Sequence, residues 1–121
     1  MTAAQETVAH RAAAALLERG GREVRVGIVL GSGLGAVADA VADALAVPYG
    51  ELPGFPRPGV AGHAGRAVVG ELAGVPVAVL QGRQHLYEDP PREAVSTPVR
   101  ALRLAGAETV ILTNAAGSLR P

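Results

Sequence analysis

The chain has 121 residues, of which 49% are hydrophobic. That is enough for one compact domain with a core, and it sets residues 1–121 as a single domain. Eleven arginines balance eleven acidic residues and lysine is absent, so the charge gives no reason to expect nucleic acid or a membrane as partner, and Schiff-base chemistry is excluded. The absence of cysteine excludes disulfides and thiolate sites. No targeting segment is evident, and we expect a cytoplasmic protein.

The first half of the chain alternates helix and strand signals. Residues 2–19 predict a helix that a glycine pair ends, and residues 24–30 predict a buried strand. Apolar residues at helical spacing over residues 34–45 predict a second helix packed on the sheet. Residues 49–65 are rich in proline and glycine and predict a long surface loop.

The second half predicts strands around one more helix. Residues 66–72 and 75–80 fit an antiparallel hairpin. Val95, Val99 and Leu102 share one face of a helix that ends near Gly106, and Pro98 either kinks it or marks its first turn after a Thr97 cap. Residues 108–113 predict the last strand. The alternation predicts an α/β fold with a mixed, mainly parallel sheet and flanking helices.

A glycine-rich loop follows the first predicted strand. The run GIVLGSGLG at residues 27–35 ends an apolar strand in alternating glycines and enters a predicted helix. Glycines let the backbone approach an anion, and the first amides of a helix are unpaired, so the loop predicts a phosphate site. The dinucleotide fingerprint fits the same loop through Gly31, Gly33 and Ala36, with Glu51 near its acidic position. A dinucleotide-binding Rossmann-like module and a purely structural turn therefore stay open.

A second cluster, GRQHLYE at residues 82–88, supplies fixed charge. In an extended backbone Arg83, His85 and Tyr87 project from one side. Arginine binds phosphate through two parallel hydrogen bonds, histidine adds a donor, and tyrosine offers a ring and a hydroxyl. This set suits a sugar-phosphate junction. The alternative is a solvated loop.

Three other polar residues carry weaker signals. His63 has glycines close on both sides, which fits either a ligand contact or a turn. Asn114 follows the last predicted strand, where its side chain either caps the loop or reaches a ligand. His10 is expected on a solvated helix face.

Four segments together resemble one family. GIVLGSGLG, LPGFPRPGVAGHAG, GRQHLYE and LTNAAGSL occur in the order of the signature segments of the trimeric purine nucleoside phosphorylases, over nearly the whole chain. The resemblance implies reversible phosphorolysis of purine ribo- and deoxyribonucleosides to the free base and pentose 1-phosphate. It implies inorganic phosphate as co-substrate, no other cofactor, no metal, and a homotrimer whose neighbours complete each active site.

The resemblance also assigns roles to individual residues. The phosphate-contacting set is Ser32, His63, Arg83, Gln84, His85 and Ala115, the last through its backbone amide. Tyr87 and Asn114 are assigned to the substrate, with Tyr87 packing on the sugar. His85 and Glu88 are assigned to catalysis, Glu88 by orienting His85.

Two features depart from the family pattern. Ser118 and Arg120 stand where the family has a glycine and an asparagine, and family members are considerably longer. The chain therefore resembles an N-terminal portion that carries the phosphate-binding half. Besides the phosphorylase and the dinucleotide-binding module, a third hypothesis is that the chain binds phosphate weakly and has no turnover alone.

Overall fold

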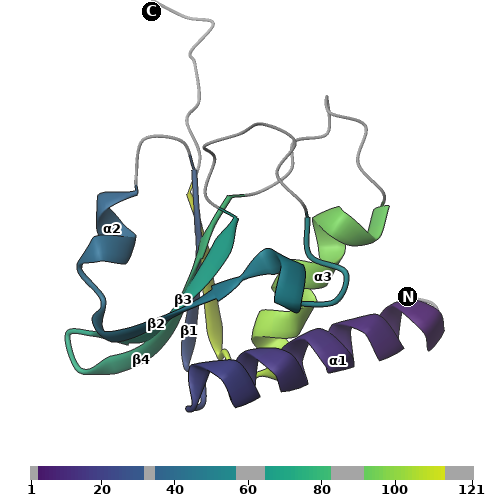
Figure 1. Cartoon of the computed structure of the whole chain (residues 1–121), viewed down its shortest axis with the longest axis horizontal. Helices are drawn as coiled ribbons and strands as arrows, with labels where there is room; N and C mark the ends of the chain where they lie inside the picture. Colours follow the sequence, from purple (N-terminus) through teal and green to yellow (C-terminus); the bar gives the residue numbers. More distant parts are fainter. Residues whose placement is uncertain (1–2, 32–34, 57–64, 83–91, 114–121) are drawn as a thin grey trace, which may run out of the picture.

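The structure is a computed structural model that describes residues 3–31, 35–56, 65–82 and 92–113 (Figure 1). In chain order the elements are α1 (Ala3–Gly20), β1 (Val26–Leu30), α2 (Ala36–Asp39), β2 (Ala42–Pro48), the 3-10 helix η1 (Tyr49–Glu51), β3 (Arg66–Leu72), β4 (Val75–Gln81), α3 (Arg92–Leu104) and β5 (Thr109–Leu112). Within this described part of the chain, no helix is both long and apolar enough to span a membrane.

The five strands form one sheet in the order β2-β3-β4-β1-β5. β1 is parallel to β4 and β5, whereas β3 is antiparallel to β2 and β4. The predicted mixed α/β sheet with flanking helices is confirmed. Four of the five described strands, β1, β2, β4 and β5, run in the same direction, and β3 runs opposite to them, so the sheet is mainly parallel in strand direction, as predicted.

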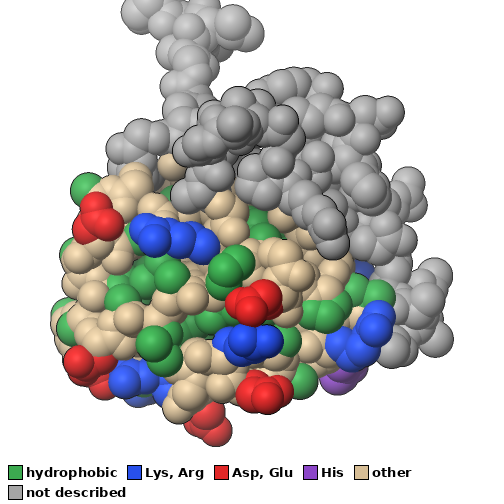
Figure 2. All heavy atoms as spheres, viewed as in Figure 1, with side chains coloured by type: hydrophobic (Ala, Val, Ile, Leu, Met, Phe, Trp, Pro, Cys, Tyr) green, Lys and Arg blue, Asp and Glu red, His purple; other side chains and the backbone are tan. Residues whose placement is uncertain are grey.

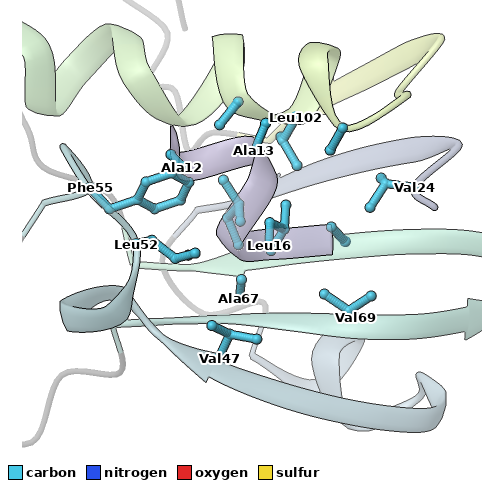
Figure 3. Packing of buried hydrophobic residues seen from close by; sticks show 14 of the residues in the cluster. Ala12, Ala13, Leu16, Val24, Val47, Leu52, Phe55, Ala67, Val69 and Leu102 are labelled. Atoms are coloured by element: carbon cyan, nitrogen blue, oxygen red, sulfur yellow. The ribbon is translucent and has the colours of Figure 1, made fainter. Parts of the chain in front are cut away.

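Helices cover both faces of this sheet. Figure 1 shows α1 and α3 on one side and α2 on the other. Alternation along β3 divides its side chains between the two layers, because successive residues of a strand point to opposite faces. Ala67 and Val69 join the larger core with α1 and α3, where Leu16 and Leu102 are completely buried (Figure 3). Val68 joins the smaller core under α2.

The two elements with the strongest local signals match their predictions. α1 ends at Gly20, and Gly21, at φ +72°, donates its N–H to the Leu17 carbonyl at 3.0 Å. A glycine is suited to this left-handed position at a helix end. The β3–β4 hairpin turns through Ala73 and Gly74, both with positive φ, as in the tight turns that match strand twist.

The predicted helix over residues 34–45 is wrong in extent. α2 covers only Ala36–Asp39, and β2 begins at Ala42 and pairs with β3. A β-carbon on Gly70 would collide with the Ala42 carbonyl oxygen, so the missing side chain of Gly70 lets the incoming chain lie against β3. Asp43, at φ +53°, interrupts the strand where the register shifts, and Leu45 is exposed rather than packed.

α3 (Arg92–Leu104) forms as predicted, but Val99 does not share the buried face of Leu102. The helix begins at Arg92, so Pro98 lies inside the helix and not in its first turn. Leu102 is buried, as expected, whereas Val99 is exposed. Leu102 packs over Gly27 of β1, where a β-carbon would lie 2.7 Å from Leu102 Cδ1. The absent side chain of Gly27 therefore allows α3 to approach the sheet closely.

Candidate functional site

One edge of the sheet collects the ends of several strands. Leu30 pairs with Gln81, Gln81 with Arg66, and Arg66 with Pro48. In β5, Leu112 pairs with Val29, which comes immediately before Leu30. In Figure 1, β1 ends at the top of the sheet.

The segments that carry the predicted contact residues enter or leave the sheet at this edge. Gly31, Gly82 and Thr113 follow the ends of β1, β4 and β5, and Gly65 precedes β3. In open α/β sheets, ligands bind outside the carboxyl ends of parallel strands, which here are β1, β4 and β5.

The predicted contact residues themselves lie outside the described residues, so their roles stay predictions. They are Ser32, His63, Arg83, Gln84, His85, Tyr87, Glu88, Asn114 and Ala115. The structure does describe their flanks. Ser32 follows Gly31, Arg83 follows Gly82, Asn114 follows Thr113, and His63 precedes Gly65 by two positions. All four flanking residues belong to the same edge.

Thr113 connects the end of β5 to the end of β1. The Gly31 N–H donates to Thr113 Oγ1 at 2.6 Å, and the Thr113 hydroxyl donates to the Val29 carbonyl oxygen at 3.0 Å. The Thr113 N–H also donates to that carbonyl, at 3.1 Å. One hydroxyl thus acts as acceptor and donor between two strands, a double role that its chemistry permits.

Gln81 makes a second connection along the edge. Arg66 Nε donates to Gln81 Oε1 at 2.5 Å, and Gln81 Nε2 donates to the Gly35 carbonyl at 3.5 Å, a long bond. These bonds link the start of β3, the end of β4 and the residue before α2. Gln81 therefore holds the far side of the glycine loop near the end of β4.

Tyr49 makes a third connection from η1. Its N–H donates to the Gly65 carbonyl at 2.8 Å, and its hydroxyl donates to the Gly82 carbonyl at 2.5 Å. Its ring is buried edge-on against Phe55, with centroids 5.1 Å apart. Burial raises the pKa of the Tyr49 phenol above its ordinary value, which keeps the hydroxyl protonated as a donor.

Sequence reasoning missed these three polar side chains. Gln81 ends β4 and Thr113 comes directly after β5, and a polar residue at the end of an apolar run was the available signal. Tyr49 lay in the stretch predicted as loop. None of the three has a recognisable motif, because each is defined by a partner distant in sequence.

Three ion pairs lie on the described surface. Arg19 lies 3.0 Å from Glu51, and Arg22 lies 3.1 Å from Glu71. Figure 2 shows acidic and basic side chains interspersed over the described part of the face in view. Among the described residues there is no group of three His, Cys, Asp or Glu side chains that could hold a metal ion.

The topology contradicts the dinucleotide hypothesis. In a Rossmann unit the strand after the first helix is parallel to the first strand and adjacent to it. Here β2 is the outermost strand of the sheet, separated from β1 by β3 and β4, and it is antiparallel to its neighbour β3. Glu51, the expected ribose ligand, lies in η1 and forms an ion pair with Arg19.

Comparisons with known proteins agree with the sequence resemblance. The model of the phosphorylase superfamily matches residues 25–121. Purine nucleoside phosphorylase 1 of Geobacillus stearothermophilus is 43% identical over 113 residues, which are 93% of this chain and 41% of the relative. The purine nucleoside phosphorylase of Bos taurus is 44% identical over 106 residues, which are 88% of this chain and 37% of the relative.

Solved structures show the same likeness in the fold. A Schistosoma mansoni purine nucleoside phosphorylase in complex with inosine matches with a TM-score of 0.85 and 35% identity, covering 94% of this chain and 40% of that one. A purine nucleoside phosphorylase in complex with ribose-1-phosphate matches with a TM-score of 0.86 and 38% identity, and the match covers 95% of this chain and 42% of that one. This chain thus spans about 40% of the length of its relatives. By its family match, sequence identities and shared fold, the chain belongs to the phosphorylase superfamily, and its relatives there are purine nucleoside phosphorylases.

Proposed function

We propose that the chain carries the phosphate-binding half of a purine nucleoside phosphorylase. In the proposed reaction, inorganic phosphate displaces the purine from C1′ of a ribo- or deoxyribonucleoside and gives pentose 1-phosphate, in a reversible step. The observation that carries the proposal is the common edge. The flanks of all four segments with predicted contact residues, namely Gly31, Gly65, Gly82 and Thr113, belong to one edge of the sheet.

The proposed chemistry depends on holding an anion in place. A ribosyl transition state develops positive charge at the sugar, so a phosphate fixed on one face both attacks C1′ and stabilises that charge. Arg83, His85 and the amides of the glycine loop are proposed to bind the phosphate, with Ser32, His63, Gln84 and Ala115 as further contacts. Glu88 is proposed to orient His85. Tyr87 and Asn114 are assigned to the nucleoside.

Relatives support the choice of substrates. Their structures include complexes with inosine and with ribose-1-phosphate, which are a nucleoside and a pentose phosphate of the proposed classes. Phosphate is proposed as co-substrate, with no metal and no further cofactor. A homotrimer is the proposed assembly, and light scattering tests it by a mass near three times the 12.2 kDa of the chain.

The direct test is calorimetric titration of the chain with inorganic phosphate and, separately, with NAD. We expect phosphate to bind and NAD not to bind. Arg83→Ala should weaken phosphate binding roughly tenfold or more, because a hydrogen bond to a charged group contributes about 1.5–3 kcal/mol. Arg103→Ala removes an exposed arginine from the last turn of α3 and is the matched control. Equal phosphate affinity in the Arg83→Ala variant would refute the site.

A phosphorolysis assay with inosine adds a separate readout. Because the chain spans about 40% of the relatives' length, binding is the criterion for the proposal. Release of hypoxanthine by the chain alone would extend the proposal from phosphate binding to turnover and would exclude the hypothesis of a binding-only chain.

A further inference from the structure

We infer that Thr113 is a positioning residue that fixes the glycine loop relative to the loop after β5. This inference rests on the proposed phosphate site. Its evidence is the bridge by which the Thr113 hydroxyl connects the end of β5 to the end of β1, through hydrogen bonds of 2.6 Å from the Gly31 N–H and 3.0 Å to the Val29 carbonyl oxygen.

The bridge connects the two residues from which the proposed contacts begin. Gly31 comes immediately before Ser32, and Thr113 immediately before Asn114 and Ala115. The two bridged residues are 82 positions apart in the sequence, so a single hydroxyl joins chain exits from different strands. A shift of one exit is therefore transmitted to the other.

The bridge also occupies the backbone amide at the start of the glycine loop. The Gly31 N–H is already used by Thr113, so it is not available to an anion. The amides proposed to bind the phosphate are therefore those that follow Gly31. Thr113 acts on phosphate through this backbone and not by contact.

A hydroxyl is required for this role. Valine has nearly the same shape as threonine but neither accepts nor donates a hydrogen bond, so Thr113→Val leaves the half-buried Gly31 N–H without its partner. Serine keeps the hydroxyl and loses only a methyl group. The comparison of the two variants separates hydrogen bonding from side-chain volume.

The test uses Thr113→Val and Thr113→Ser, with Thr109→Val as control. Thr109 is exposed and begins the same strand β5 at the opposite end. Amide hydrogen exchange of Gly31 is measured by NMR, and phosphate affinity by calorimetry. We expect Thr113→Val to speed exchange at Gly31 and weaken phosphate binding, each about tenfold, the size expected for one lost bond with an unpaired donor. Thr113→Ser keeps the hydroxyl, so its Gly31 exchange rate and its phosphate affinity should stay within about twofold of the wild type.

The outcomes separate this inference from the proposed function. Wild-type chain that binds no phosphate overturns both together. Wild-type binding that Thr113→Val leaves unchanged, or that Thr113→Ser fails to restore, overturns the positioning role alone. A loss of affinity in Thr109→Val equal to that in Thr113→Val would also overturn it. If Thr113→Val does not fold, Thr113→Ala serves as the hydroxyl-free variant and is held to the same outcomes.

Discussion

Gly27 is the residue whose replacement tests the packing of α3 against the sheet most sharply. A β-carbon built at Gly27 would lie 2.7 Å from Leu102 Cδ1 and 3.2 Å from both Cδ2 and Cγ. Leu102 is completely buried, so its side chain has little room to move away. Overpacking a well-packed core costs about 1–3 kcal/mol. Replacing glycine by alanine regains about 0.4–1 kcal/mol through the unfolded chain. We therefore expect Gly27→Ala to lower the free energy of unfolding by about 1–2 kcal/mol.

Urea unfolding followed by circular dichroism measures this effect. With a slope of about 1–3 kcal/mol per molar urea, the midpoint should fall by roughly 0.3–2 M. Gly50→Ala is the matched control, because a β-carbon at Gly50 meets nothing within 4 Å. In a Leu102→Ala background the clash is gone, so the cost of Gly27→Ala should largely vanish. Gly27→Ala as stable as the wild type, or an equal cost in both backgrounds, would refute the reasoning.

Three further predictions concern Tyr49, Gly70 and Leu112. Tyr49→Phe removes the hydroxyl that donates to the Gly82 carbonyl and should cost about 0.5–1.5 kcal/mol in urea unfolding at pH 7. Burial raises the pKa of Tyr49 in the folded state, so its contribution to the free energy of unfolding is fully present below the unfolded pKa of about 10 and is lost as the pH rises beyond it. Above pH 10, Tyr49→Phe should therefore lose less stability than the wild type does. Equal losses in the two proteins would contradict this. Gly70→Ala forces β2 away from β3 and should cost more than about 2 kcal/mol, seen as a fall in melting temperature that Gly50→Ala does not share. Leu112→Lys changes a side chain that is 60% exposed on β5, the outermost strand on its side of the described sheet. It should alter stability by less than about 0.5 kcal/mol and reduce self-association in sedimentation velocity, and unchanged association would count against an exposed β5 edge.

Elements with local causes could be predicted from the sequence. α1 has an apolar face and a terminal glycine, and the β3–β4 hairpin has Ala73-Gly74 between two β-rich runs. β2 could not be predicted, because its apolar spacing also fits a helix and the deciding factor is Gly70, which lies on another strand.

The same distinction applies to the candidate site. The motifs indicated which segments carry phosphate chemistry, and the strand register brings the flanks of those segments to one edge of the sheet. The supporting bonds of Thr113, Gln81 and Tyr49 depend on partners that tertiary structure supplies. No spacing along the chain encodes them.

Phosphate is proposed to bind where β1, β4 and β5 end. An NMR titration of the labelled chain with inorganic phosphate tests it directly, through the backbone amide shifts. Saturable shifts are expected at Gly31, Gly82 and Thr113, with none at Gly74, which lies in the turn at the opposite end of the strands. Shifts confined to Gly74 and its surroundings, or no saturable shift at Gly31 and Thr113, would contradict it.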